Sequence, residues 1–236
     1  MIIKHIPIKL LFAFLLLGFF THSLSAQETI ATARPTLSIG PWVLPENSFQ
    51  WEQGAQYSDI DRDEWAYDAL IRASLSRSTE IRISIPTLED RFATMGLKWM
   101  MIQPEGNKPG IGFSINMGSK SNSNEGGNSF KVLGYRVAVN KNLSDKLVGF
   151  INAGYTSGGY FGDFTLAYAL IDGLTATAEY WHHQDYKQVQ STVSYLINSE
   201  TQIDLNGGLL FDAGNDYTFG FGLSRRFKYT GSRNNQ

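Results

Sequence analysis

The stretch that decides the fold runs from Thr201 to Ser224 and reads TQIDLNGGLLFDAGNDYTFGFGLS. On both sides of the polar segment 212–216, apolar residues recur at a spacing of two, interrupted at Gly207, and they are Ile203, Leu205, Leu209, Phe211, Tyr217, Phe219, Phe221 and Leu223. The positions between them are mostly polar residues or glycine. A period of two belongs to a strand whose two faces meet different surroundings. The stretch therefore predicts an antiparallel hairpin.

The same period recurs along the chain, for example over Phe49 to Tyr57 and Ile111 to Gly118, and helical spacing is nowhere sustained. It predicts twelve strands, at residues 48–57, 65–76, 80–86, 92–102, 109–118, 130–140, 146–156, 162–171, 174–182, 187–197, 201–211 and 216–227. The third strand is short, so the pattern leaves ten strands as an alternative. Most turns after even-numbered strands are short, and the longest connection, Lys120 to Ser129, follows an odd-numbered strand, as in outer-membrane barrels.

A soluble β-sandwich also alternates, so the class of sheet has to be decided on other grounds. Here the polar face is rich in Gly, Ser, Thr, Asn and Gln and carries few lysines, which suits a crowded lumen better than a solvated face. Aromatic residues also gather near strand ends, as in interfacial girdles, and these are Trp65, Tyr67, Tyr155, Tyr160, Tyr180, Trp181 and Tyr217. Both features predict an all-β fold, an antiparallel up-and-down transmembrane β-barrel.

The N-terminus predicts export. Lys4 and Lys9 precede an apolar run from Leu10 to Phe20, and small or polar residues follow up to Ala26. This is the arrangement of a signal peptide over residues 1–26, and the run is too short for a permanent membrane helix. We expect cleavage near Ser25 or Ala26 and insertion into the outer membrane of a Gram-negative cell. The expected partners are then outer-membrane lipid and the barrel-assembly machinery.

Composition narrows the function classes. The chain has no cysteine, which excludes a disulfide scaffold and thiolate metal sites. Cleavage would remove two lysines and leave 18 basic against 22 acidic residues, a net charge of −4. Nucleic acid is therefore not expected as a partner. The mean hydropathy of −0.20 argues against a helical membrane protein. We expect no cofactor.

Three further segments are distinguished by their patterns. Residues 27–47 hold Pro35, Pro41 and Pro45 and show no alternation, so they are expected to form a lead-in segment, either in the periplasm or inside the lumen. Residues 48–227 form the expected barrel. Residues 228–236 form a polar tail, and Arg225 stands where an apolar residue is expected.

Charged residues on the polar face are the candidate site. Parity assigns eight to the lumen, four acidic and four basic: Glu52, Asp68, Arg72, Arg82, Lys98, Arg136, Glu179 and Asp204. A charge inside a barrel needs a partner or water. Two interpretations stay open, a paired network that fills a narrow lumen and a constriction that selects substrate. The even balance argues against strong ion selectivity.

A second cluster, His182, His183 and Asp185, invites a metal or catalytic interpretation. Neighbouring strand residues point to opposite faces, so the two histidines cannot share one ion, and an exposed pair at a loop edge is favoured. A lipid hydrolase at the rim would need a serine beside this histidine. Ser191 and Ser194 are available, but neither stands in a recognisable motif.

The chain resembles the outer-membrane family known as the MetA-pathway of phenol degradation family, whose members are described as transporters. The resemblance lies in Arg34-Pro35-Thr36, Gly40-Pro41-Trp42, Leu44-Pro45 and Ser48-Phe49-Gln50, in Ile171 to Tyr180 (IDGLTATAEY), and in Asp212 to Tyr217 with Gly220, Gly222, Leu223, Ser224 and Phe227. It implies an outer-membrane barrel that takes up small, hydrophobic or aromatic organic solutes and carries no catalytic residue. The alternatives are a structural or adhesive barrel and a rim-located lipid hydrolase.

Overall fold

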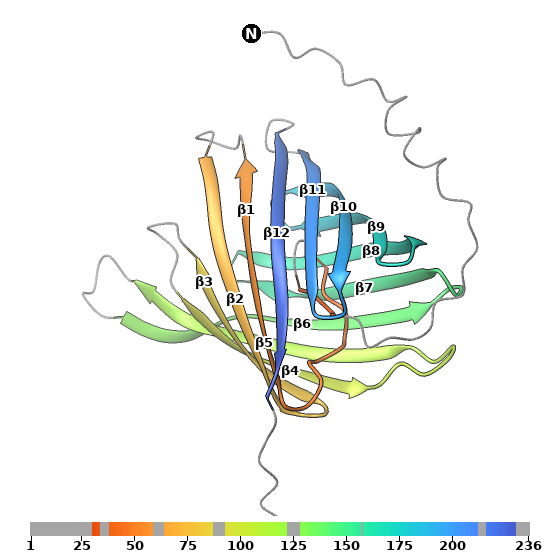
Figure 1. The fold of residues 1–236 in the computed structure, drawn as a ribbon. Helices are drawn as coiled ribbons and strands as arrows, with labels where there is room; N and C mark the ends of the chain where they lie inside the picture. The colour runs from red at the N-terminus through yellow and green to blue at the C-terminus, as the bar shows by residue number, and fades with distance from the viewer. Residues whose placement is uncertain are drawn as a thin grey trace, which may run out of the picture.

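The computed structural model describes residues 30–33, 38–58, 64–86, 93–121, 128–156, 158–211 and 216–229. Within these ranges the chain forms one closed barrel in which each strand pairs antiparallel with the next and β1 pairs with β12 (Figure 1). The strands are β1 (Ser48–Ser58), β2 (Glu64–Ser76), β3 (Thr79–Pro86), β4 (Thr94–Ile102), β5 (Gly110–Ser121), β6 (Asn128–Asn142), β7 (Leu147–Thr156), β8 (Gly159–Ile171), β9 (Leu174–His183), β10 (Lys187–Asn198), β11 (Thr201–Phe211) and β12 (Tyr217–Lys228).

The prediction of twelve strands is confirmed, and each predicted strand boundary lies within three residues of the observed one. The short third strand exists as β3, which excludes the ten-strand alternative. A single sheet closed on itself also excludes the sandwich. The expected long loop Lys120 to Ser129 is shortened from both sides by β5 and β6, and its centre, 122–127, lies outside the described residues. No helix among the described residues is long and apolar enough to cross a membrane.

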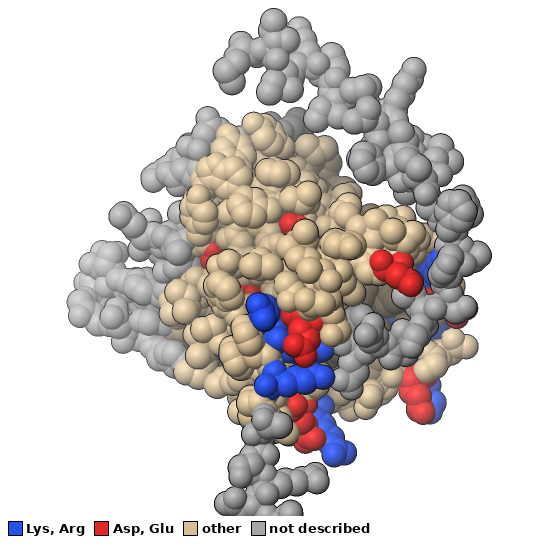
Figure 2. All heavy atoms as spheres, in the orientation of Figure 1, with Lys and Arg blue, Asp and Glu red and all other residues tan. Residues whose placement is uncertain are grey.

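Polarity is arranged inside out compared with a water-soluble protein. On β10, Gln190 and Thr192 point into the barrel and are each 1% exposed, whereas Val189 and Val193 are 42% and 46% exposed on the outside. The face of the molecule in Figure 2 is largely uncharged, with most of its charged side chains around the lower end of β12. An apolar outer wall and a polar lumen are what a barrel in a bilayer requires.

Most of the expected girdle lies on the outer wall, toward the beginnings of β2, β8 and β12 and the ends of β7 and β9. The ring centroids of Tyr57 and Trp65 are 5.7 Å apart, and those of Tyr155 and Tyr160 are 5.4 Å apart. Trp181 is the exception, because its side chain faces the lumen, is 5% exposed and stacks on Phe161. Its assignment to the girdle was wrong, since the aromatic pair Tyr180-Trp181 is split between the two faces of β9.

Arg225 does not disrupt the closing strand. It is exposed on the outer wall near the end of β12, and its guanidinium carbon lies 5.2 Å from the ring centroid of Phe227. The Phe227 ring also stacks on Phe49 of β1, with centroids 4.7 Å apart. This pairing covers the aliphatic part of Arg225 while its charge stays at the membrane edge. β12 includes Lys228, and Tyr229 donates its N–H to Asn47 O at 2.8 Å.

Candidate functional site

The lead-in segment lies inside the barrel. Of its described residues, 30–33 and 38–47, Leu44 is 1% exposed, Ser38 is 4% exposed and Pro41 is fully buried. These described residues form no strand before Ser48, so their backbone N–H and C=O groups need other partners once they leave water. Side chains of the barrel wall supply them. The structure therefore places these parts of the lead-in segment in the lumen, the second of the two locations that the sequence left open.

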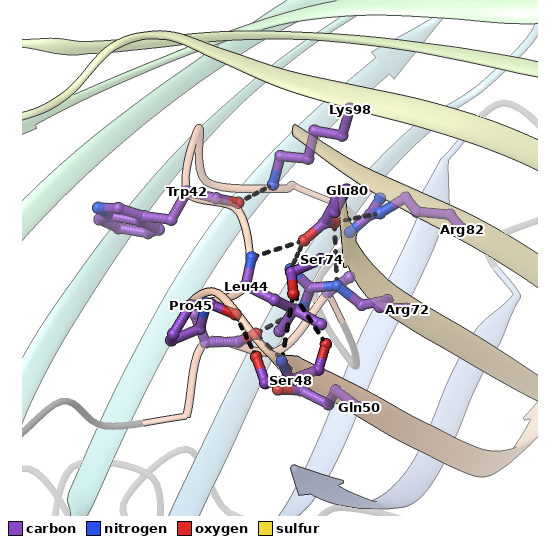
Figure 3. A network of polar contacts seen from close by, with 12 residues as sticks. Trp42, Leu44, Pro45, Ser48, Gln50, Arg72, Ser74, Glu80, Arg82 and Lys98 are labelled. Atoms are coloured by element: carbon purple, nitrogen blue, oxygen red, sulfur yellow. Dashed lines mark hydrogen bonds and ion pairs between the residues drawn. The ribbon is translucent and has the colours of Figure 1, made fainter. Parts of the chain in front are cut away.

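On one wall, Glu80 of β3 is the centre of the contacts (Figure 3). Its Oε2 accepts the N–H of Leu44 at 2.9 Å and an Nη2–H of Arg72 at 2.8 Å. Its Oε1 accepts from Arg72 Nε at 3.0 Å and from Arg82 Nε at 2.8 Å. Nearby, Lys98 Nζ donates to Trp42 O at 2.5 Å. Glu80 is fully buried, and both of its oxygens are satisfied by charged donors, which makes these strong hydrogen bonds.

Arg72 links this centre to Glu52 on β1. Its Nη1 lies 2.9 Å from Glu52 Oε1 and 2.6 Å from Ala31 O. Glu52 Oε2 accepts the N–H of Ala33 at 2.9 Å, and Gln50 donates to Ala31 O at 3.1 Å. The wall therefore binds residues 31–33 through main-chain atoms.

The opposite wall holds Ser38. Its hydroxyl donates to Asp163 Oδ1 on β8 at 2.5 Å and accepts from Asn152 Nδ2 on β7 at 2.7 Å. Its N–H donates to Glu179 Oε1 on β9 at 3.2 Å. On a third side, Gln202 of β11 donates to Thr32 Oγ1 at 3.0 Å. The lead-in segment thus crosses the lumen and is held from several sides.

Close packing on β5 and β7 adds to these polar contacts. A Cβ placed on Gly112 of β5 would lie 2.8 Å from Pro41 Cα and 2.9 Å from Pro41 O, closer than real Cβ atoms come. Only glycine allows the segment to approach the β5 backbone in this way. The Trp42 ring also packs edge-on against Phe150 of β7, at 5.5 Å between centroids.

Four of the eight predicted lumen charges come together around Glu80, namely Glu52, Arg72, Arg82 and Lys98. Glu179 joins the Ser38 contacts, and Arg136 lies over the rings of Phe161 and Trp181, at 4.7 and 5.4 Å from their centroids. Asp204 is 3% exposed on β11 and Asp68 is half-buried on β2.

Two functional carboxylates escaped the sequence prediction, Glu80 and Asp163. Each stands two positions from a lumen residue of the same strand, Arg82 and Thr165, so strict parity would have found both. Glu80 was missed because it begins the predicted third strand.

His182 and His183 lie on opposite faces of β9, as expected, but His183 is 5% exposed and was wrongly assigned to an exposed pair. Its Nε2 lies 3.4 Å from Thr156 Oγ1, and its Nδ1 accepts the N–H of Asp185 at 3.3 Å and lies 3.8 Å from the Asp185 carboxylate. The ring therefore joins Thr156 at the end of β7 to the connection between β9 and β10, and we interpret this cluster as structural.

The described residues line two cavities on the lumen side of the barrel, and the larger one lies beside the lead-in segment. The larger, about 280 Å³, lies between Ala33 and Ile39 of that segment and the wall of β2 to β6, where Arg82 and Arg136 line it. The smaller, about 160 Å³, shares Thr94, Asn116 and Arg136 with it and reaches Leu133 and Phe161. Among the residues that the structure describes, no group of His, Cys, Asp or Glu could hold a metal ion.

Comparison with known proteins finds similarity in structure only. No family model matches the sequence, and no curated protein matches it. The KdgM porin in complex with disordered oligogalacturonate has a TM-score of 0.56 at 12% identity, over 76% of this chain and 99% of that chain. Omp33 of Acinetobacter baumannii, an outer membrane protein, has a TM-score of 0.52 at 10% identity, over 77% and 99%. At such identities the likeness concerns the fold, and the chain has the closed twelve-stranded barrel fold of outer-membrane porins.

Proposed function

We propose that the chain is an outer-membrane channel for small organic solutes whose lumen is narrowed by its own lead-in segment. The observation that carries the proposal is the pairing of a closed, polar-lined barrel with a buried N-terminal segment inside it, where the described residues line cavities of about 280 and 160 Å³. Export through a cleaved signal peptide over residues 1–26 is part of the proposal, and those residues lie outside the described ranges.

The resemblance to the MetA-pathway of phenol degradation family supports small aromatic compounds as the solute class. The likeness to porins in fold supports a permeability role over an enzymatic one.

Reconstitution into planar bilayers and liposomes tests the proposal. The mature protein is expected to pass small solutes with low conductance, because the lead-in segment fills much of the lumen. A variant that lacks residues 30–43 should show a larger conductance and faster liposome swelling, since Leu44 to Ser48 still lead into β1. Heat-modifiable migration on gels verifies that both proteins are folded barrels. Two folded proteins that are equally impermeable would overturn the channel proposal.

A further inference from the structure

An amide side chain faces the lipid at the middle of β1, on Gln53. The residue before it, Glu52, is fully buried on the lumen side, so Gln53 points outward. Gln53 pairs with Leu223 of β12 and with Ala69 of β2, which share its face. Its amide makes no hydrogen bond to any residue that the structure describes. Such an amide is costly in a bilayer, because the hydrocarbon core offers it neither water nor another polar group.

Gln53 lines a recess of about 680 Å³ on the outer face of β2, β1, β12 and β11. The recess exists because two outward side chains beside Gln53 are short, Ala55 of β1 and Ala69 of β2. Two strands that flank a third lie roughly 10 Å apart, yet the ring centroids of Trp65 on β2 and Phe221 on β12 are 6.1 Å apart. The two rings therefore lean together over β1, which explains why the outward-facing Ala55 is only 2% exposed.

The rim of the recess is apolar. Tyr67, Leu205 and Phe221 line it and are each at least 50% exposed. Asp68 and Asp204 reach the recess from behind, because they alternate with Tyr67 and Leu205 and so belong to the lumen face. The outer face in Figure 2 is accordingly largely uncharged. Within lipid, small residues let two proteins approach closely, and amide side chains hydrogen-bond across the contact.

We propose that the barrel forms a homodimer through this face, in which the Gln53 amides of the two copies hydrogen-bond to each other. A primary amide is both donor and acceptor, so two of them form a reciprocal pair, as a twofold interface requires. Both copies enter the membrane in the same orientation, so the twofold axis runs along the membrane normal and equivalent residues meet at equal height. A lipid chain would also fill the recess, but it would leave the amide without a partner.

The position of Gln53 within the recess suits such an axis. Its strand, β1, lies between β2 on one side and β12 and β11 on the other. An axis that passes in front of β1 brings the β2 side of one copy against the β12 and β11 side of the second copy. Tyr67 of one copy then packs near Leu205 of the other. The dimer goes beyond the proposed function, because each barrel keeps its own lumen.

Cross-linking in outer-membrane vesicles tests the contact on the intact protein. The chain has no cysteine, so Leu223→Cys places a single thiol beside Gln53 and keeps the amide. Ala153→Cys is the matched control, because Ala153 is exposed on the outer wall of β7, across the closed barrel from β1. A short bismaleimide should link the first protein into dimers and leave the second monomeric. Equal cross-linking at both sites, or none at the first, would overturn the inference.

Sedimentation equilibrium of the mature barrel in detergent measures the strength of the dimer. Gln53→Leu should raise the dissociation constant by roughly three- to twentyfold, the range for a hydrogen bond between side chains in a membrane. Ala69→Phe should abolish the dimer with Gln53 intact, because its ring occupies the recess, whereas Ala153→Phe should leave the dimer unchanged. Heat-modifiable migration verifies that all three variants are folded barrels. A monomeric wild type, or a dimer that neither Gln53→Leu nor Ala69→Phe weakens, would overturn the inference.

Discussion

Arg72 holds both carboxylate oxygens of Glu80, with its Nε 3.0 Å from Oε1 and its Nη2 2.8 Å from Oε2. The same guanidinium binds Glu52, and all three side chains are at most 1% exposed. Strand parity placed Arg72 and Glu52 on the same lumen face, and the ion-pair partners of Arg72 are Glu52 and Glu80.

Replacing Arg72 by methionine should therefore destabilise the barrel strongly. Two carboxylates would stay buried without their main partner, which costs about 3 to 5 kcal/mol for a broken buried pair. Urea unfolding in lipid vesicles measures the change. Arg77→Met is the control, because Arg77 pairs with Glu46 on the surface and should leave the unfolding midpoint unchanged. Equal midpoints for the two variants would show that the Arg72 network does not stabilise the barrel.

The orientation of β5 can be tested with one pair of neighbouring residues. Ile115 lies on the outer wall, opposite Leu97 and Tyr135, and Asn116 points into the lumen. A lysine at 115 should cost roughly 2 to 4 kcal/mol in a bilayer, and a lysine at 116 much less, because the lumen offers water and polar groups. The same unfolding assay compares them. Similar losses at both positions would contradict the assignment of faces.

The position of the lead-in segment can be followed with a single thiol, because the chain has no cysteine of its own. Ser38→Cys places it among Asp163, Asn152 and Glu179, whereas Ser144→Cys places it in an exposed turn. A water-soluble maleimide should label the thiol at 144 rapidly and the thiol at 38 slowly. Both should react alike after denaturation. Rapid labelling at 38 in the folded protein would mean that the segment leaves the lumen.

The histidines should be dispensable for solute entry. His182 is on the outer wall, and neither histidine lines the two cavities, although the His183 ring contacts Thr156, which lines the smaller one. Changing both to alanine should leave the rate of liposome swelling unchanged. Assays of phospholipid and lipopolysaccharide hydrolysis provide the opposing test. An activity that the wild type has and the double variant lacks would favour the hydrolase alternative.

Sequence periodicity predicted the strands, their number and the face of most residues, because each depends on local alternation between lipid and lumen. The prediction of location failed where the type of a residue suggested one environment and its position in the alternation gave another. Trp181 looks like a girdle residue but occupies a lumen position, where it supports Arg136. His183 looks like a loop histidine but is buried at the rim.

Sequence periodicity could not predict which residues contact one another across the lumen. Glu80 meets Arg72 through the register of neighbouring strands, but Asp163 and Glu179 meet Ser38 only because the lead-in segment crosses the barrel. That segment has no period, since its backbone is satisfied by side chains of the wall. A count of charges therefore gave a balanced lumen but not which charges meet through the lead-in segment.

The wall recognises the lead-in segment mainly by its main chain. Glu52, Glu179 and Glu80 accept the N–H groups of Ala33, Ser38 and Leu44, and Arg72 and Lys98 donate to the C=O groups of Ala31 and Trp42. Every residue except proline offers these groups, whatever its side chain. The side chains at Ala31 and Ala33 are thus free to vary, whereas the wall residues that bind their main chain are constrained. Related barrels should keep Glu52 and Arg72 even where positions 31 and 33 carry other residues.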